Sequence, residues 1–228
     1  MRIGMLTGGG DCPGLNAVIR AAVRKGINHY GDEFVGFMEG WRGVIDDKTM
    51  PLDLTTTSGI LQKGGTILRS SRTNVKKVEG GFEKCLSNIK KHNLDALIAL
   101  GGDDTQSISV ELIKRGVPCV GVPKTIDNDL SGIGQALAEE IEKRTGYETR
   151  AVNLGHTQRG GTPSAYDRML ASRYGVAAID LVHAGKFGRL IVLKGTQISD
   201  IPLADAIAKT RTVGDDLFAV QASLEPKL

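Results

Sequence analysis

The amino-acid sequence predicts a doubly wound α/β protein, in which helices cover both faces of a mostly parallel sheet. Short apolar runs alternate with longer stretches of helical periodicity along most of the 228 residues. Glycine-rich turns follow several of the apolar runs, and 30 of the residues are glycine. The chain shows no internal repeat and no low-complexity linker, so we expect one continuous fold.

The first half of the chain alternates strands with helices. The apolar runs Ile3–Leu6, Phe34–Met38, Ala96–Leu100 and Cys119–Val122 predict strands, and the helical patterns cover Leu15–Asn28, Phe82–His92 and Asp104–Arg115. The first helix places Leu15, Val18, Ile19, Ala22 and Val23 on one face. The stretch Gly40–Gly65 is glycine- and threonine-rich, and we expect a long functional loop there, anchored by Trp41.

The second half continues the alternation. It predicts helices at Ile133–Thr145, Asp167–Ala184 and Leu203–Lys209, and strands at Thr149–Leu154 and Leu190–Leu193. A last amphipathic stretch, Asp215–Leu224, is expected to pack the C-terminus against the rest of the protein.

Composition excludes several classes of function. The formal net charge is only +3 and the charges are dispersed, so no nucleic-acid partner is expected. Aromatic residues make up 4%, too few for a platform that stacks bases. No apolar run approaches the roughly 18 residues of a membrane helix. Three widely spaced cysteines (Cys12, Cys85 and Cys119) lack metal-ligand spacing and indicate a reducing cytoplasm.

A glycine loop, GGGDCPG (8–14), follows the first predicted strand. Because glycines lack a Cβ atom, backbone N–H groups can approach a phosphate beside the positive end of the next helix. The spacing is neither that of a dinucleotide-binding loop nor that of a P-loop. A tight strand-to-helix turn is the plainer interpretation, but three consecutive glycines exceed what such a turn needs.

A second glycine loop, GGDDT (101–105), follows the strand predicted at 96–100. Its glycines again admit a phosphate, and Asp103 and Asp104 can hold a hard cation such as Mg²⁺. Asp104 and Thr105 could instead be helix-capping residues. Asp103 is the stronger candidate for metal binding, because phosphate chemistry nearby needs a metal.

The third loop, PKTIDND (123–129), follows the strand predicted at 119–122. Lys124 supplies a positive point charge for a phosphate. Asp127 and Asp129 alternate along the chain, so that one can accept a proton while the other supports a metal or its waters. In such sheets ligands bind at the carboxyl ends of the strands, where all three loops lie. Together they predict a phosphate site.

Five motifs resemble those of the phosphofructokinase family and occur in that family's order. They are GGGDCPGLNAVIR (8–20), GGTILRSSR (64–72), GGDDT (101–105), PKTIDND (123–129) and GHTQRGGTPSAYDR (155–168). The resemblance implies the large, Rossmann-like lobe of these glycolytic enzymes, with Mg²⁺ and phosphoryl transfer to the 1-hydroxyl of fructose 6-phosphate. It is closest to the pyrophosphate-dependent members, because ATP-dependent relatives typically carry glycine in place of Asp104 and Lys124. An aspartate at 104 would repel the inner phosphate of ATP, and Lys124 would bind pyrophosphate.

The resemblance also implies individual roles. Asp127 would be the base for the sugar hydroxyl, supported by Thr125 and Asp129, while Asp103 supports the metal. The donor phosphates would lie against Gly9, Arg72, Asp104 and Lys124, although the segment that carries Arg72 could be only a surface turn. Fructose 6-phosphate would be bound by His156 and Arg159, and by Arg150 of a neighbouring subunit in a homo-oligomer.

One long stretch of the family pattern is missing. After Leu130 the family continues with a segment that grips the sugar phosphate, whereas this chain proceeds to Ser131-Gly132, which resembles the family much further downstream. The resemblance therefore implies that residues 1–228 are the phosphate-donor lobe, with the smaller fructose 6-phosphate lobe excised near 130–132. Such a chain is expected to fold and to turn over fructose 6-phosphate poorly or not at all.

Three other functions stay open on the sequence. The chain could be a non-catalytic domain that binds pyrophosphate or a nucleotide, which the missing stretch favours. It could be an ATP-dependent phosphofructokinase. It could also belong to the NAD kinases and lipid kinases, which share a GGD loop, but PKTIDND is not expected in them.

Overall fold

The structure is a computed structural model that describes residues 1–10, 12–123, 133–150, 161–208 and 215–224. At its centre is a seven-stranded sheet with the order β3-β2-β1-β4-β5-β6-β7. The parallel strands are β1 (Arg2–Thr7), β2 (Glu33–Phe37), β4 (Ala96–Leu100), β5 (Cys119–Val122) and β6 (Arg189–Lys194), and the antiparallel edge strands are β3 (Thr49–Leu52) and β7 (Gln197–Pro202). The predicted α/β class is confirmed.

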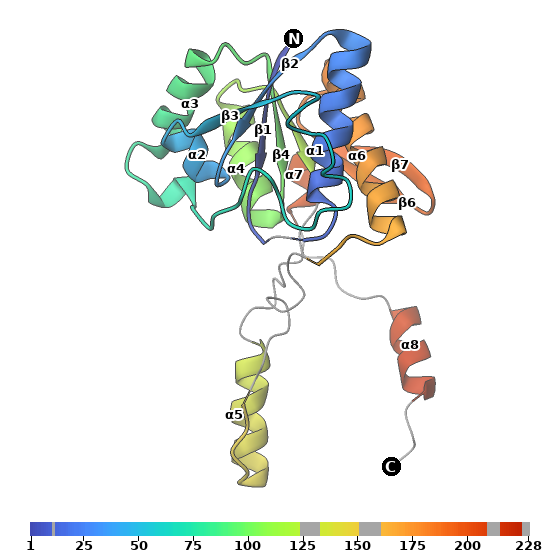
Figure 1. Ribbon diagram of the computed structural model, residues 1–228. Helices are drawn as coiled ribbons and strands as arrows, with labels where there is room; N and C mark the ends of the chain where they lie inside the picture. Colours follow the sequence, from blue (N-terminus) through green and yellow to red (C-terminus); the bar gives the residue numbers. More distant parts are fainter. Residues whose placement is uncertain (11, 124–132, 151–160, 209–214, 225–228) are drawn as a thin grey trace.

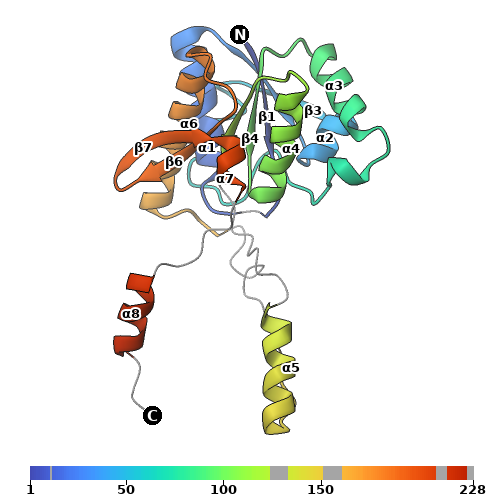
Figure 2. The ribbon, with the colours of Figure 1, turned by 180° about the vertical axis from the view of Figure 1, so that it is seen from behind.

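Helices cover both faces of this sheet (Figures 1 and 2). One face carries α1 (Leu15–Lys25), continued by a π-helical turn at Gly26–Tyr30, together with α6 (Ala165–His183). The other face carries α2 (Trp41–Ile45), α3 (Gly81–Lys91) and α4 (Asp103–Lys114), with the short α7 (Leu203–Ala206) beside α4 and a 3₁₀ turn at Val75–Lys77 near α3. The doubly wound arrangement is therefore confirmed as well.

The core follows from the predicted periodicities. All five apolar residues assigned to one face of the first helix are buried. The strand β4 is buried along its whole length, as expected of a parallel strand covered on both faces. The helix α6 packs on α1 through Gly175, whose missing Cβ would lie 2.4 Å from the carbonyl oxygen of Val18. Glycine is required there because the two helices approach so closely.

The long loop predicted at 40–65 is wrong in its first part, which forms α2 and the edge strand β3, with Trp41, Val44, Ile45 and Leu52 buried. Residues 53–65 contain neither helix nor strand. Trp41 therefore anchors a helix rather than a loop. The strand β7 was not expected either, and the last predicted helix before the C-terminal stretch is shorter, ending at Ala206. Of the strand predicted at 149–154, Thr149 and Arg150 are not in a strand, and the remainder lies outside the described residues.

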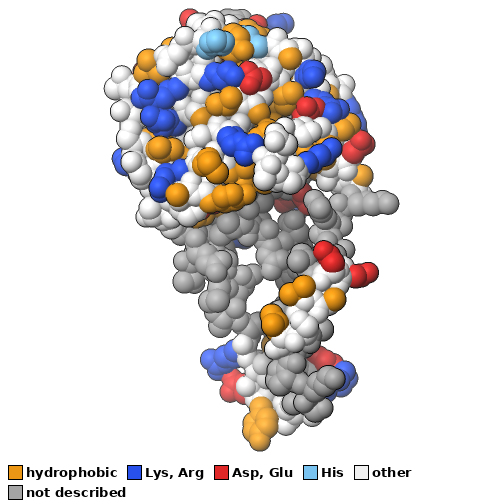
Figure 3. All heavy atoms as spheres, turned by 90° about the vertical axis from the view of Figure 1, so that its right-hand side faces the viewer, with side chains coloured by type: hydrophobic (Ala, Val, Ile, Leu, Met, Phe, Trp, Pro, Cys, Tyr) orange, Lys and Arg blue, Asp and Glu red, His pale blue; other side chains and the backbone are white. Residues whose placement is uncertain are grey.

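Two helices lie outside this body. Both α5 (Ile133–Thr145) and α8 (Asp215–Leu224) project from the edge of the sheet at which the parallel strands end (Figures 1 and 2). The expectation that the last stretch packs down is not met, because Val220 is 57% exposed and Leu224 is 77% exposed. Figure 3 shows apolar side chains on the surface of these projecting parts. Among the described residues, no helix has the length and apolar character needed to cross a bilayer.

Candidate phosphate-binding site

The candidate site lies where the strand order reverses. From β1 the chain moves to β2 on one side, and β4 then pairs with β1 on the other side. At the carboxyl ends of this pair, the amide of Gly8 donates to the carbonyl of Leu100 at 2.8 Å, and that of Gly101 donates to Val122 at 3.0 Å. Such a reversal opens a crevice in which α/β proteins bind ligands.

The two glycine loops touch each other in this crevice. A Cβ atom on Gly101 would lie 2.5 Å from the carbonyl oxygen of Gly8 and 2.6 Å from Oγ1 of Thr105, and one on Gly8 would lie 2.5 Å from the same hydroxyl. Gly9 has a φ of 77°, a left-handed conformation that favours glycine, and is half-buried. The close packing explains the glycines at 8 and 101 and leaves Gly9 on the accessible side.

The carboxylates of the second loop begin helix α4. Asp103 and Asp104 are exposed in its first turn, where negative charge complements the helix dipole. The N-cap position of α4 is occupied by Gly102, so no side chain forms a capping hydrogen bond there, and Thr105 is buried. The alternative of Asp104 and Thr105 as capping residues is therefore wrong, and both carboxylates are free to face a ligand.

The residues that sequence analysis expected at the site are only partly described. Arg72 is exposed at the end of an irregular segment that is tied to the first glycine loop. Arg150 is exposed after α5, and its guanidinium binds the carboxylate of Glu148 at 2.6 Å. The remaining candidates lie outside the described residues: Lys124, Thr125, Asp127, Asp129, His156 and Arg159.

Three buried polar residues at this edge were not recognised from the sequence. The amide nitrogen of Gln106 donates to the carbonyls of Ala99, Gly101 and Val122, at 3.1, 3.2 and 3.4 Å, and so joins the ends of β4 and β5. Thr7 and Asn16 bind the segment that precedes Arg72. The only sequence signal was a polar residue on a face that periodicity assigns to the core.

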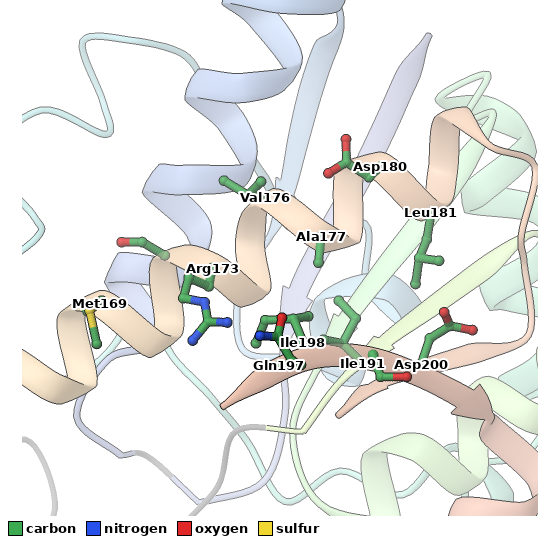
Figure 4. Close-up of a pocket in the computed structure, with 12 residues that line it drawn as sticks. Met169, Arg173, Val176, Ala177, Asp180, Leu181, Ile191, Gln197, Ile198 and Asp200 are labelled. Atoms are coloured by element: carbon green, nitrogen blue, oxygen red, sulfur yellow. The ribbon is translucent and has the colours of Figure 1, made fainter. Parts of the chain in front are cut away.

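A groove of about 660 Å³ lies elsewhere, between α6 and the hairpin of β6 and β7 (Figure 4). Apolar side chains such as Val176, Leu181, Ile191 and Ile198 line it. Its two acids are already paired, Asp180 with Lys25 and Asp200 with Arg189. None of its lining residues comes from the glycine loops, so it is separate from the candidate site.

The fold and this site define a class of protein: a doubly wound α/β protein with two touching glycine loops and two exposed carboxylates at the reversal of its strand order. The chain belongs to the phosphofructokinase family. The family's sequence profile, described as Phosphofructokinase, matches residues 2–134 and 131–182.

Comparison with individual proteins agrees. The chain is 36% identical to a pyrophosphate--fructose 6-phosphate 1-phosphotransferase of Streptomyces coelicolor, over 334 positions that take in 96% of this chain and 98% of the relative. It is 32% identical to ATP-dependent 6-phosphofructokinase 3 of the same organism, with the same coverage. The crystal structure of a pyrophosphate-dependent phosphofructokinase from Marinobacter aquaeolei shares the fold, with a TM-score of 0.73, 14% identity, and coverage of 95% of this chain and 86% of that one.

The alignment is longer than the chain. It runs over 334 positions, whereas this chain has 228 residues, so at least 106 positions of the alignment in total face no residue of the chain. The family profile likewise matches in two parts, which meet at residues 131–134.

Proposed function

We propose that this protein transfers a phosphoryl group from pyrophosphate to the 1-hydroxyl of fructose 6-phosphate, the reaction named for its S. coelicolor relative. The observation that carries the proposal is the meeting of Gly8 and Gly101 directly beside Asp103 and Asp104, at the reversal of strand order. Backbone N–H groups and paired carboxylates at one point are what a phosphate with its metal requires.

The described residues fit Mg²⁺. They hold no cluster of three or more His, Cys, Asp or Glu side chains that could bind a metal. Mg²⁺ in phosphotransferases is nevertheless usually bound by one or two carboxylates together with waters and substrate phosphates. Asp103 would supply such a carboxylate, and a bound Mg²⁺ would neutralise charge on the phosphoryl oxygens, while Asp104 would face the donor phosphates.

The chain's own residues would divide the remaining work. We assign the donor phosphates to the backbone at Gly9 and to the side chains of Arg72 and Lys124. Asp127 would accept the proton of the sugar hydroxyl, with Thr125 and Asp129 supporting it, and the sugar phosphate would be bound by Arg150, His156 and Arg159. An aspartate with its usual pKa of about 3.9 is a weak base at neutral pH. Positioning and positive charge would therefore supply most of the rate enhancement.

We also propose that the chain is a donor lobe with an interrupted second lobe. The total of at least 106 aligned positions that face no residue of the chain, and the family match in two parts that meet at 131–134, support an excision near 130–132. The helix α5 begins directly after this point, and its Leu137 and Ile141 are 53% and 47% exposed. Helices α5 and α8 then belong to the lobe that is incomplete.

The first experiment separates donor binding from turnover. We expect calorimetry to detect binding of pyrophosphate in the presence of Mg²⁺, because the donor loops are intact. A coupled assay with fructose 6-phosphate should give little or no turnover, because substrate positioning is lost. Turnover at the level of complete relatives would contradict the interrupted lobe. Absence of pyrophosphate binding would contradict the proposed function.

A non-catalytic pyrophosphate-binding domain is the second candidate, and the interrupted lobe is the observation that favours it. We place either activity in the cytoplasm, because the three cysteines are buried thiols that form no disulfide. Burial raises the pKa of Cys85 and of Cys119 to about 12, so neither thiol is a nucleophile at neutral pH. We expect family-type homo-oligomers only when the second lobe is complete.

Donor choice provides a further prediction. Replacing Asp104 and Lys124 together by glycine should strengthen ATP binding by about 10-fold and weaken pyrophosphate binding by a similar factor, because a repulsive carboxylate and an attractive ammonium are lost together. Titration calorimetry with each ligand measures both changes. Glu111→Gln, on the same helix but engaged with Lys114 and Arg115, is the control and should change neither affinity. An unchanged ATP affinity in the double variant would contradict the account of these positions.

A further inference from the structure

The segment that carries Arg72 has no regular structure. Between residues 60 and 74 there is neither helix nor strand, so no backbone ladder fixes its position. The segment is nevertheless closely attached to the body. Leu68 is fully buried against β2, where a Cβ on Gly36 would lie 2.5 Å from the Leu68 side chain. One backbone hydrogen bond, from the N–H of Glu39 to the carbonyl of Leu68 at 2.7 Å, joins the segment to the chain after β2, and side chains from other elements supply further contacts.

Asn16 forms the main attachment. It is in the first turn of α1, directly after the first glycine loop, and is buried. Its amide nitrogen donates to the carbonyls of Lys63 and Gly64, at 3.1 and 3.3 Å. Its amide oxygen accepts from the backbone N–H of Ile67 at 2.8 Å. Both ends of one buried amide thus bind the same segment, about 50 residues away along the chain.

Two further contacts connect the segment to the glycine loop. The hydroxyl of Thr7, the residue before Gly8, donates to the carbonyl of Arg69 at 2.8 Å. The hydroxyl of Ser71 donates to the carbonyl of Glu39 at 2.6 Å. Gly40, which follows Glu39, lies so close to the first loop that a Cβ there would meet the carbonyl oxygen of Thr7 at 2.9 Å. Ser71, the residue before Arg72, is thereby attached to the chain beside the first glycine loop.

We propose that Asn16 is a positioning residue for the donor site: it acts through residues 63–69 to hold Arg72 where it can bind the donor phosphate. This inference rests on the proposed function, because the ligand of Arg72 is taken to be pyrophosphate. Asn16 is the second residue of the helix that follows the first glycine loop.

Asn16→Asp is the sharpest test. The substitution keeps the shape and the acceptor for Ile67 but replaces the NH₂ group, which donates both hydrogen bonds, by one carboxylate oxygen that faces the two carbonyls. We expect the dissociation constant for pyrophosphate with Mg²⁺ to rise by about 10-fold, the loss expected when one charge-assisted contact is misplaced. Asn88→Asp is the matched control, because Asn88 also donates to two carbonyls, but to those of Val44 and Ile45 in α2 rather than to residues 60–74. It should cost similar thermal stability and leave the dissociation constant within about twofold.

A double-mutant cycle that combines Asn16→Asp with Arg72→Ala distinguishes positioning of Arg72 from general destabilisation of the protein. If Asn16 acts through Arg72, the double variant should bind pyrophosphate no more weakly than Arg72→Ala alone, whereas independent roles would give multiplied losses. Additive losses, or equal weakening by the Asn16 and Asn88 variants, would overturn the inference.

Limited trypsin digestion tests the same inference without a ligand. The segment contains cleavage points after Lys63, Arg69 and Arg72. Asn16→Asp should speed cleavage there by about fivefold or more relative to Asn88→Asp, because local opening becomes easier. If Asn16→Asp speeds cleavage but the unsubstituted protein does not bind pyrophosphate, the role of Asn16 in attaching the segment stands and only the proposed function is contradicted. Unchanged cleavage would contradict the role of Asn16 itself.

Discussion

Insertion of the missing segment between Leu130 and Ser131 is expected to raise the rate of fructose 6-phosphate phosphorylation by at least ~10³-fold over the chain as it stands. The segment to insert is the stretch of the S. coelicolor relative that faces no residue of this chain between these two positions. Orientation of two reactants supplies a large part of the catalysis in such transfers, and this chain is proposed to keep only the donor half of that arrangement.

The position of the projecting helices is the physical reason for this expectation. They extend from the edge of the sheet where the glycine loops meet, so a completed second lobe would lie directly over the donor phosphates (Figure 1). Completion should also cover the exposed apolar side chains of α5 and α8 and remove their tendency to associate.

The assay is steady-state production of fructose 1,6-bisphosphate with pyrophosphate and Mg²⁺. A glycine- and serine-rich insert of equal length at the same point is the control and should leave activity at the starting level. If both inserts, or neither, raised the rate, the interrupted-lobe proposal would be wrong.

Gly175→Leu is expected to lower the free energy of unfolding by about 3 kcal/mol, near the upper end of what overpacking usually costs. Any side chain at 175 meets the carbonyl oxygen of Val18 at 2.4 Å and the Cβ of Ala21 at 3.0 Å. These atoms belong to α1 and cannot rotate away, so the two helices would have to separate.

Urea unfolding followed by circular dichroism measures this effect. Val176→Leu is the control, because Val176 lies on the same helix and is partly exposed, and it should change the free energy of unfolding by about 0.5 kcal/mol or less. Equal midpoints for the two variants would show that the close approach of α1 and α6 does not limit stability.

The sequence was sufficient for the elements that periodicity controls. The bounds of β4, β5 and α5 agree with the prediction at both ends, because a run of buried aliphatic residues or a clear helical period marks each of them. The two edge strands were missed for a physical reason. β3 contains Pro51, and β7, with the sequence QISDIP, is only half-buried, so neither shows an apolar run or a regular alternation.

The candidate site likewise contains residues that could be predicted from the sequence and residues that could not. The glycine loops and Asp103 and Asp104 could be predicted, because strand, turn and helix are consecutive in the chain. The role of Asn16 could not, since its partners lie about 50 residues away and only the folded chain brings them together. Asp104 and Thr105 were ambiguous until the cap proved to be Gly102. The predicted catalytic residues in PKTIDND remain predictions.

The parallel pairing of β5 with β6 has a consequence for how this fold can change. The two strands pair through Val120 and Gly121, and α6 crosses between them, although residues 123–164 separate β5 from the start of α6. Neither the sheet nor the contact of α1 with α6 requires a particular length of chain in that interval. The part of the interval that follows the PKTIDND loop is therefore a grafting point, at which a different acceptor-recognition module could be joined while the donor half remained unchanged. New acceptor specificities could arise on this scaffold by exchange of one contiguous stretch of the gene.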